Sequence, residues 1–254
     1  MGNIVKRHKY ILEQIKKNGY VKVHELSVEL GVSEVTVRKD LKYLESRKLL
    51  YRAHGSASTL GSITVERHVD EKEKVQVEEK NRIAKAAKAL LEPNDKIIIA
   101  SGTTLLTFAN EIDSDFSLTV ITSSVKVALT LCYSPNIEIV QLGGTMRKNS
   151  ASVIGHYAEE MLKTLSFDKL FLGVDGLDLS TGLTTSNLNE AHINKQMIEA
   201  SQEIIVLTDS TKFGKTGFCK ICDLDKIHHI ITDTNAPSHI ISMIEEKGIK
   251  VTLV

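Results

Sequence analysis

The amino-acid sequence predicts an α/β fold in two parts: a small N-terminal unit of the winged helix-turn-helix type, then a larger domain with a mostly parallel sheet. Three observations predict it. The first sixty residues carry 12 Lys and Arg against 6 Asp and Glu, whereas the remainder carries 20 against 26. Apolar residues at helical spacing fill the basic part, and strand patterns alternate with helix patterns in the acidic part. Several strands are continuous apolar runs such as "IIIA" and "IIVL", which is typical of parallel strands buried on both faces.

Composition and length restrict the class of protein. The chain has 254 residues, of which 42% are hydrophobic and 25% charged, and both values are ordinary for a globular protein in water. It contains no apolar run near the roughly 20 residues that cross a bilayer, and its N-terminus lacks the apolar core of a signal peptide. Its three cysteines argue against a disulfide framework. We therefore expect a cytoplasmic protein with no membrane partner.

The first two predicted elements are short helices. The stretch "KRHKYILEQIKKNG" is amphipathic, with Ile11 and Ile15 on one side. A second helix follows, in which Leu26 and Leu30 lie four residues apart, and Gly31 then permits a tight turn.

A third helix begins after Ser33, a residue type that caps helix N-termini well. Val37, Leu41 and Leu44 give this helix a buried stripe at helical spacing. Helix, glycine turn and helix form the helix-turn-helix pattern, in which the second helix enters the major groove of DNA. The outward-facing residues that we expect to contact DNA are Ser33, Thr36, Arg38, Lys39 and Lys42.

A β-hairpin is expected next, in "KLLYRAHGSASTL", where two short extended segments flank a His-Gly-Ser turn. Such a wing places Arg52 and His54 near a phosphate or the minor groove. The alternative is a small helical bundle with a solvated basic face. The net charge of +6 over residues 1–60 and the hairpin both favour binding to a polyanion such as DNA.

The stretch "VKVHELSVELGVSEVTVRKDLKYLESRKLLYRAHGSA" closely resembles the winged helix-turn-helix of the DeoR family of bacterial transcription regulators. The family pattern Ser-x-x-Thr-[Ile/Val]-Arg-[Arg/Lys]-Asp-Leu stands at residues 33–41. Its Leu-x-Arg-x-His-Gly-Gly-Ala stands at residues 50–57, with Ser56 in place of a usual Gly. The resemblance implies that residues 1–60 bind double-stranded operator DNA. Because symmetric operators need paired DNA-binding domains, we also expect a homo-oligomer, a dimer or a tetramer.

Residues 61–75, "GSITVERHVDEKEKV", are polar and alternate in charge, and we interpret them as the connection between two domains. A helix with core spacing at Ile83, Ala84 and Ala87 follows from about Val77. The second domain is therefore expected over residues 76–254.

Strand and helix patterns alternate through this second domain, which predicts a parallel sheet covered by helices. The strands expected are 96–100, 118–122, 137–142, 169–174, 203–207, 228–232 and 249–254. The further helices expected are 105–112, 125–132, 157–165, 189–201 and 238–247.

Five of the predicted strands end in polar residues, and ligands bind beyond the carboxyl ends of strands in such a sheet. Gly102 lets backbone N–H groups turn inward, and Thr103 and Thr104 stand at a helix N-terminus, where the dipole favours phosphate. Arg and Lys at other ends supply positive charge, and Asp accepts hydrogen bonds from sugar hydroxyls. Each residue alone also fits a helix cap, a turn or a solvated lysine, but the five ends together favour an anionic, polyhydroxylated ligand. The expected lining residues are Ser101, Gly102, Thr103, Thr104, Ser123, Gly143, Gly144, Arg147, Asp175, Glu190, Lys195, Asp209 and Lys212.

The second domain resembles the C-terminal sensor domain of the same DeoR family, in "SGTT", "QLGGTMR", "KLFLGVDGLDLSTGLTTSNLNEAHINKQMIEAS" and "VLTDSTKFG". That sensor domain is similar in fold to ribose-5-phosphate isomerase, whose Asp-Gly-Ala-Asp and Asp-x-Ser-Lys segments resemble "DGLD" at 175–178 and "DSTK" at 209–212. The resemblance implies a phosphorylated sugar as the effector ligand, and no cofactor. The family often has Asp where this chain has Ala100, and Asn where it has Ser123, so the identity of the sugar does not follow from the resemblance.

An enzyme is the first alternative. A sugar-phosphate isomerase fused to a DNA-binding domain would need a general base, for which Asp175, Asp178 and Glu190 are the candidates. The isomerase's Lys-Gly-Gly-Gly stretch is missing after "DGLD", where "LSTGLTTSNLNEAH" follows. The sequence therefore favours a protein that is not an enzyme.

A zinc-dependent regulator is the second alternative, because Cys219 and Cys222 are followed by His228 and His229. A structural zinc site needs four ligands and usually a second well-spaced pair, whereas adjacent residues of a strand point to opposite faces. We therefore expect plain thiols and no metal.

Together these patterns predict a repressor of a sugar-metabolism operon that a phosphorylated sugar releases from DNA. A transcriptional activator that uses the same two sites is the remaining alternative.

Overall fold

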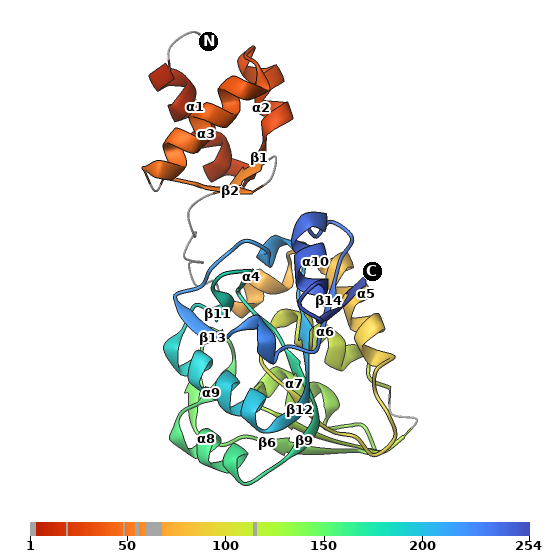
Figure 1. The fold of residues 1–254 in the computed structure, drawn as a ribbon. Coiled ribbons are helices and arrows are strands. Elements are labelled where there is room, and N and C mark those ends of the chain that lie inside the picture. The colour runs from red at the N-terminus through yellow and green to blue at the C-terminus, as the bar shows by residue number, and fades with distance from the viewer. Residues whose placement is uncertain (1–3, 19, 48, 54–55, 59–67, 114–115) are drawn as a thin grey trace. The chain divides into compact units, whose positions relative to one another are not determined.

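The computed structural model describes residues 4–18, 20–47, 49–53, 56–58, 68–113 and 116–254. The chain divides into two compact units, Met1–Ser62 and Ile63–Val254, and each unit is considered by itself (Figure 1). His54, which was predicted to contact DNA, lies outside the described residues.

The first unit packs helices over a small antiparallel sheet. Its elements are α1 (Ile4–Asn18), β1 (Tyr20–Lys22), α2 (Val23–Leu30), α3 (Glu34–Ser46), β2 (Tyr51–Ala53) and β3 (Ser56–Ser58). Strand β3 pairs with β2, as predicted for the wing, and also with β1. The sequence did not predict β1, because three residues are too few to show a period. The buried core of this unit contains Ile11, Ile15, Val21, Val23, Leu26, Leu30, Val37, Leu41, Leu44 and Leu50.

The predicted turn between α2 and α3 is confirmed. Gly31 ends α2 in the left-handed conformation, with φ 62° and ψ 38°, which glycine adopts without steric cost. Its N–H donates back to the carbonyl groups of Ser27 and Val28. Ser33 then caps α3, since its hydroxyl accepts a hydrogen bond from the Thr36 N–H at 3.2 Å.

The second unit is built on one parallel sheet. Its strands are β4 (Lys96–Ile99), β5 (Leu118–Thr122), β6 (Ile137–Gln141), β9 (Phe167–Leu172), β12 (Ser201–Leu207), β14 (His229–Thr232) and β15 (Lys250–Leu253). Among the described residues, they pair in the order β15-β14-β12-β9-β4-β5-β6, and every pair of neighbours is parallel. The predicted strands are thus confirmed as members of one sheet, with ends that shift by one or two residues.

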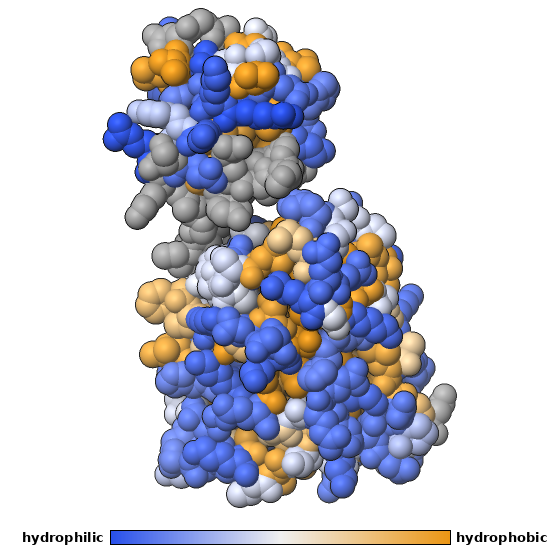
Figure 2. Space-filling view, in the orientation of Figure 1, coloured by the Kyte–Doolittle hydropathy of each residue, from blue (hydrophilic) through white to orange (hydrophobic). Residues whose placement is uncertain are grey.

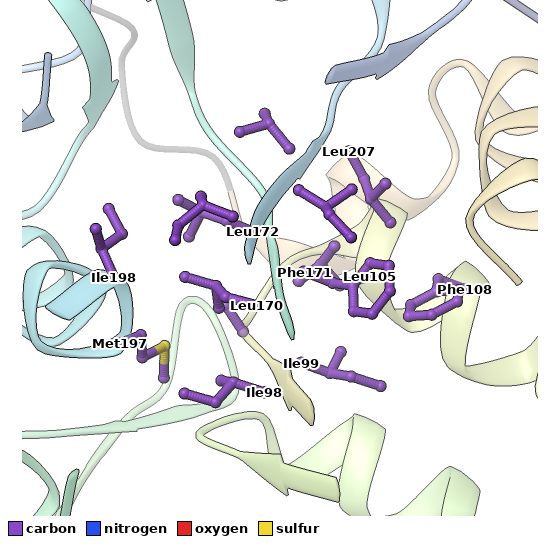
Figure 3. Close-up of a cluster of buried hydrophobic side chains, with 14 of the residues drawn as sticks. Ile98, Ile99, Leu105, Phe108, Leu170, Phe171, Leu172, Met197, Ile198 and Leu207 are labelled. Carbon is purple, nitrogen blue, oxygen red and sulfur yellow. The ribbon is translucent and has the colours of Figure 1, made fainter. Parts of the chain in front are cut away.

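Helices cover both faces of this sheet. They are α5 (Val77–Lys88), α6 (Thr103–Glu111), α7 (Val125–Leu131), α8 (His156–Lys163), α9 (Leu188–Glu199) and α10 (Ser238–Glu245). On one face Phe171 of β9 packs against Phe108 of α6, with ring centroids 4.5 Å apart. Its neighbours Leu170 and Leu172 point the other way, toward Met197 of α9 (Figure 3). Burial on both faces explains the continuous apolar runs of the strands.

The chain reverses its direction of travel across the sheet between β4 and β9. From β4 it proceeds outward to β5 and β6, and it then returns to β9 on the other side of β4. Such a switch point leaves a crevice at the carboxyl ends of the two strands, and ligands bind there in sheets of this kind. The two strand ends are close, since a Cβ on Gly173 would lie 3.5 Å from the carbonyl oxygen of Ser101.

The second unit also contains short elements that the sequence did not predict. They have three to five residues each, too few for a periodic pattern to show. These elements are α4 (Val69–Glu73), the hairpin β7 (Thr145–Arg147) and β8 (Ser152–Ile154), the sheet of β10 (Gly176–Asp178), β11 (Gly182–Thr185) and β13 (Cys219–Cys222), and the 3-10 turns η1 (Ser210–Lys212) and η2 (Leu224–Lys226).

Helix α4 lies inside the segment 61–75 that was expected to connect the domains. The Val69 side chain is buried, and its N–H donates to the carbonyl oxygen of Asn149 at 2.8 Å. The second half of the expected connection is therefore part of the second unit, because charge alternation in the sequence does not distinguish a connection from a short solvated helix.

Candidate DNA-binding surface and effector site

The outward face of α3 carries the predicted DNA contacts. Ser33, Arg38, Lys39 and Lys42 are exposed, and Thr36 is half-buried beside them. On the face seen in Figure 2, hydrophilic side chains cover most of the first unit, and apolar ones stand in small separate groups. The exposed Arg38, Lys39 and Lys42 give this face of α3 positive charges that suit a polyanion.

Two contacts order the side chains of this face. The Arg38 guanidinium donates to the Glu34 carboxylate at 2.9 Å, one helical turn away, and both groups are exposed. The hydroxyl groups of Ser33 and Thr36 lie 2.9 Å apart. An exposed pair of this kind contributes little stability, so Arg38 can leave Glu34 for a base or phosphate at small cost.

The wing strand β2 contains Arg52, whose backbone lies opposite Ala57 of β3. The DNA contacts of Arg52 and His54 stay predictions, because the Arg52 side chain and the whole of His54 lie outside the described part of the chain.

Asp40 fixes α3 to α1. Its buried carboxylate accepts two hydrogen bonds from the Arg7 guanidinium, at 2.5 and 2.9 Å, and lies 3.0 Å from His8 Nε2. The His8 ring stacks on Tyr43, with centroids 5.1 Å apart. Burial acts to raise the pKa of Asp40, but the hydrogen bonds and charges of Arg7 and His8 outweigh it, so the pKa lies below its ordinary value. No local pattern in the sequence indicates the Arg7–Asp40 pair, because 33 positions separate its partners.

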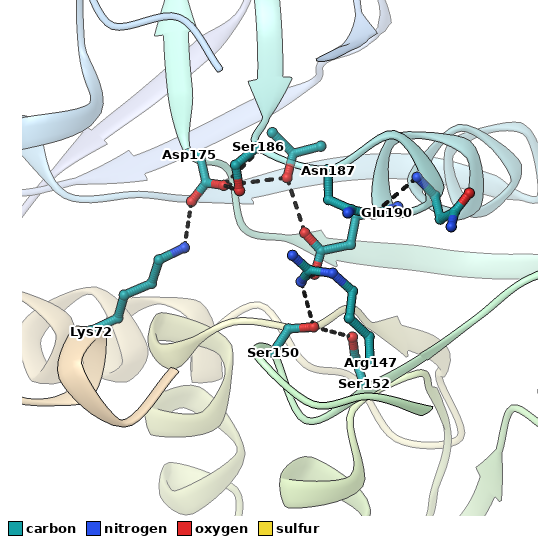
Figure 4. A network of polar contacts seen from close by, with 10 residues as sticks. Lys72, Arg147, Ser150, Ser152, Asp175, Ser186, Asn187 and Glu190 are labelled. Carbon is teal, nitrogen blue, oxygen red and sulfur yellow. Dashed lines mark hydrogen bonds and ion pairs between the residues drawn. The ribbon is translucent and has the colours of Figure 1, made fainter. Parts of the chain in front are cut away.

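Asp175 is the centre of the polar cluster at the switch point (Figure 4). One of its oxygens accepts a hydrogen bond from Lys72 Nζ at 2.7 Å. The other accepts from the Ser186 N–H at 3.0 Å, the Ser186 hydroxyl at 2.8 Å and the Thr185 hydroxyl at 3.3 Å. Burial opposes ionisation of Asp175, but the Lys72 charge and these hydrogen bonds outweigh it and lower its pKa to about 2.

Glu190 and Arg147 extend the cluster (Figure 4). Arg147 Nη1 lies 2.7 Å from Glu190 Oε1 and also donates to the Ser150 hydroxyl at 2.7 Å. The Thr185 hydroxyl lies 3.1 Å from the other Glu190 oxygen and so bridges Glu190 to Asp175. Burial raises the pKa of Glu190 above its ordinary value, although the Arg147 charge acts against it.

The N-terminus of α6 opens onto the same strand ends. Gly102 precedes the helix with φ 144°, which favours glycine, and no side chain caps the helix among the described residues. Thr103 and Thr104 begin the helix and are buried, and Ser101 precedes them half-buried. The free N–H groups of a first helical turn attract an anion.

Lys212 and Asp209 come from the end of β12. The Asp209 carboxylate is buried and caps η1, where it accepts hydrogen bonds from the N–H and the hydroxyl of Thr211. Lys212 is half-buried, and its positive charge helps to lower the pKa of Asp175. No carboxylate lies within ion-pair distance of Lys212 in the described part of the chain.

Lys80 and Lys72 are polar residues of this cluster that sequence reasoning missed. Lys80 on α5 is only 4% exposed, and its Nζ donates to the carbonyl oxygen of Lys72 at 2.5 Å. Burial lowers the pKa of Lys80, and the Lys72 and Lys212 charges lower it further. In the sequence both lysines stand among other charged residues and have the pattern of a solvated helix face.

Several predicted lining residues do not join the cluster. Lys195 is exposed on α9, where its charge acts on the Cys222 thiol. Gly143 is exposed. Gly144 lets the chain pass close to β8 of the hairpin, since a Cβ there would lie 2.7 Å from the Ile154 carbonyl oxygen. Ser123 is buried, and its carbonyl accepts the Val153 N–H at 2.8 Å.

Other candidate groups have local partners. Asp178 accepts hydrogen bonds from the N–H groups of Ser180 and Thr181 in the β10–β11 turn. His228 Nδ1 accepts the Ile204 N–H at 3.0 Å, and His229 Nε2 lies 2.8 Å from the Thr252 hydroxyl.

Cys219 is buried and Cys222 half-buried, and burial raises the pKa of the Cys222 thiol to about 12. In the part of the chain that the structure describes, no group of three or more His, Cys, Asp and Glu is placed to hold a metal ion. Across the same residues, no helix is both long enough and apolar enough to cross a membrane.

Known proteins match both units. Residues 7–62 match the model of the DeoR-like helix-turn-helix domain, and residues 75–234 match that of the DeoR C-terminal sensor domain. The chain is 37% identical over 250 residues to a putative aga operon transcriptional repressor of Escherichia coli O157:H7, which covers 98% of this chain and 93% of that protein. It is 28% identical over 247 residues to the glycerol-3-phosphate regulon repressor of Escherichia coli K12, with 97% and 98% covered.

Among solved structures, ribose 5-phosphate isomerase A from Methanocaldococcus jannaschii aligns over 54% of each chain at 20% identity, with a TM-score of 0.40. That likeness is too partial to indicate an activity. The two family matches extend over both units, and the first of these relatives is 37% identical to the chain over nearly its whole length. The chain belongs to the DeoR family of helix-turn-helix transcriptional regulators with a C-terminal sensor domain.

Proposed function

We propose that this regulator binds a symmetric operator as a homo-oligomer in the cytoplasm, represses a sugar-metabolism operon, and is released when a phosphorylated sugar binds its second unit. One observation carries the proposal: a single chain joins the open basic face of α3 to a polar cluster at a sheet switch point, where Lys and Arg charges stand beside hydroxyl-binding carboxylates. One relative is named a glycerol-3-phosphate regulon repressor, which agrees with a phosphorylated ligand.

In this proposal residues 1–60 bind DNA and residues 76–254 bind the effector. Arg38, Lys39 and Lys42 provide charge to the operator, while Ser33 and Thr36 add hydrogen bonds. The effector's phosphate lies at the N-terminus of α6 near Lys212, and its hydroxyl groups reach Asp175 and Glu190. The complete proposed lining is Ser101, Gly102, Thr103, Thr104, Arg147, Asp175, Glu190, Asp209 and Lys212.

The Arg38→Ala variant is expected to bind operator DNA about 5- to 150-fold more weakly, because a good Arg–base contact contributes about 1–3 kcal/mol of discrimination. The measurement is a gel shift with the duplex that the full-length protein enriches from random sequences. Lys9→Ala is the matched control: it removes one exposed charge and one i,i+4 pair with Glu13 from α1. Equal operator affinity in the two variants would contradict the placement of Arg38 in the interface.

The Lys212→Ala variant is expected to bind the operator normally and to lose its response to the effector, because a half-buried cation is removed from the anion site. The effector is first found by thermal shift with glycerol 3-phosphate, ribose 5-phosphate, glucose 6-phosphate and fructose 6-phosphate. A ligand at 100 times its Kd adds about 2.7 kcal/mol, or about 5–10 °C in Tm for a unit of this size.

Lys220→Ala is the control for that variant, since Lys220 is an exposed lysine of β13 that pairs with Asp223. A full effector response in Lys212→Ala would remove Lys212 from the site.

The proposal that the protein is not an enzyme has its own test: turnover of ribose 5-phosphate by the purified protein would contradict it. The low pKa of Asp175, about 2, supports a binding role, because a carboxylate of that pKa is a weak general base at neutral pH.

A further inference from the structure

We propose that helix α4 couples the effector site to the DNA-binding unit, and that the Lys72–Asp175 ion pair is the contact that the effector exchanges. This inference rests on the function proposed above. Helix α4 is the first described element of the second unit, and residues 59–67 lie between it and the last described strand of the first unit. A shift of α4 therefore moves the point from which the chain leads to the DNA-binding unit.

Polar contacts from separate parts of the second unit hold α4 in place. Lys126 of α7 pairs with Asp70 at 2.8 Å and with Glu73 at 2.6 Å. The turn between β7 and β8 accepts the Val69 N–H through the carbonyl oxygen of Asn149 at 2.8 Å. The helix is only five residues long, so these tertiary contacts, rather than its own hydrogen bonds, determine where it lies.

Lys72 joins α4 directly to the effector site (Figure 4). Its Nζ donates to Asp175 at 2.7 Å, and its carbonyl oxygen accepts from buried Lys80 at 2.5 Å. Ser186 and Thr185 occupy the other oxygen of Asp175. We infer that a sugar hydroxyl that donates to Asp175 replaces Lys72, because Lys72 is the one donor that belongs to a short, separately held helix.

The charges around Asp175 are mixed. Lys72 and Lys212 both act on Asp175 and on Lys80, and the carboxylates of Asp209 and Glu73 also act on Lys80. A sugar hydroxyl that donates to Asp175 takes the place of Lys72, which is then released from this carboxylate. One charge-assisted hydrogen bond to Asp175 replaces another, so the bound ligand can shift the balance between the two arrangements.

The closing experiment compares full-length wild type with Lys72→Met. In wild type, the sugar phosphate that gives the largest thermal shift among the four named above is expected to weaken operator binding by about 5- to 150-fold. In Lys72→Met, at saturating concentrations of that compound, we expect the thermal shift to persist and operator affinity to change by about twofold or less. Lys74→Met is the matched control, because it removes the same charge from an exposed lysine directly after α4, and it is expected to respond like wild type.

Each outcome separates the inference from the function on which it rests. A full response in Lys72→Met overturns the coupling role. Loss of the thermal shift together with the response assigns Lys72 to ligand binding alone and also overturns it. A wild-type protein that binds none of the four compounds, or binds one without any change in operator affinity, overturns the proposed function, and the inference falls with it.

A second measurement on the wild type needs no variant. Amide hydrogen exchange at Val69, whose N–H donates to Asn149, reports whether α4 stays in its place. We expect this exchange to become faster with the saturating sugar phosphate, while the amides of β4 and β9 stay protected. Unchanged exchange across α4 in a protein whose operator binding responds would overturn the inference.

Discussion

The Asp40→Ala variant is expected to lose about 3–5 kcal/mol of stability in the N-terminal unit, because the Arg7 guanidinium then lies buried without its carboxylate. A loss of that size approaches the whole stability of a domain of about sixty residues. The His8 ring loses the same partner, and its stacking on Tyr43 then no longer fixes α1 against α3. Operator binding is expected to disappear with the fold of the unit.

Amide hydrogen exchange on the full chain measures this loss of stability, because peptides from the two units are analysed separately. We expect exchange in α1 and α3 to increase by roughly 150-fold or more, the equivalent of about 3 kcal/mol, and exchange in the second unit to stay unchanged. Lys39→Ala is the control in the same helix: Lys39 is exposed, so that variant is expected to weaken DNA binding and keep its protection. If the amides of α1 and α3 in Asp40→Ala exchanged as slowly as in wild type, the buried Arg7–Asp40 pair would not be what holds the unit together.

The same carboxylate sets the direction of a pH effect. The pKa of Asp40 in the folded protein lies below its ordinary value, so its pairing contributes stability above about pH 4 and loses it as the pH falls through the folded-state pKa. We therefore expect acid to open the first unit through this group, and not through the exposed Arg38–Glu34 pair.

The sheet of the second unit was predictable because its strands satisfy one local rule. Apolar runs such as 97–99 and 204–207 are buried on both faces, so the pattern needs no knowledge of partners. The order of the strands in the sheet could not be predicted in this way, because it depends on which strands pair with one another. The sequence also missed β1, β7, β8, β10, β11 and β13, where three or four residues pair without any period to detect.

The candidate site was predictable where it follows strand ends, and hidden where it depends on distant pairing. Asp175 follows the buried strand β9 and Arg147 follows the edge strand β6, and the parallel arrangement brings such ends to one edge. Lys72 reaches Asp175 across 103 positions from a segment that looks like a connection. Lys195 stands near Glu190 in sequence, but five positions along a helix place it on an exposed face, apart from the cluster.

The Arg147→Met variant is expected to lose stability in a pH-dependent way, by about 3 kcal/mol at pH 8. Without the guanidinium, the Glu190 carboxylate stays buried with no cation at 2.7 Å, and burial already raises its pKa. A raised pKa means that the folded state holds a proton that the unfolded state releases above about pH 4.3, so stability falls as the pH rises from 5 toward the folded-state value. Asp175, with a pKa of about 2, stays ionised throughout this range and adds no slope.

The Arg147→Met/Glu190→Gln double variant tests whether Arg147 supports the cluster through its charge or by filling space. It removes both charges and keeps an amide that can accept from the Thr185 hydroxyl, which lies 3.1 Å from Glu190. Because a buried ion pair often costs little when both partners become neutral, we expect the double variant to recover most of the stability and to lose the pH slope. Thermal unfolding at pH 5, 6.5 and 8 measures both effects. An equal loss in the single and double variants would mean that Arg147 supports the cluster by filling space, and that its charge belongs to the effector rather than to Glu190.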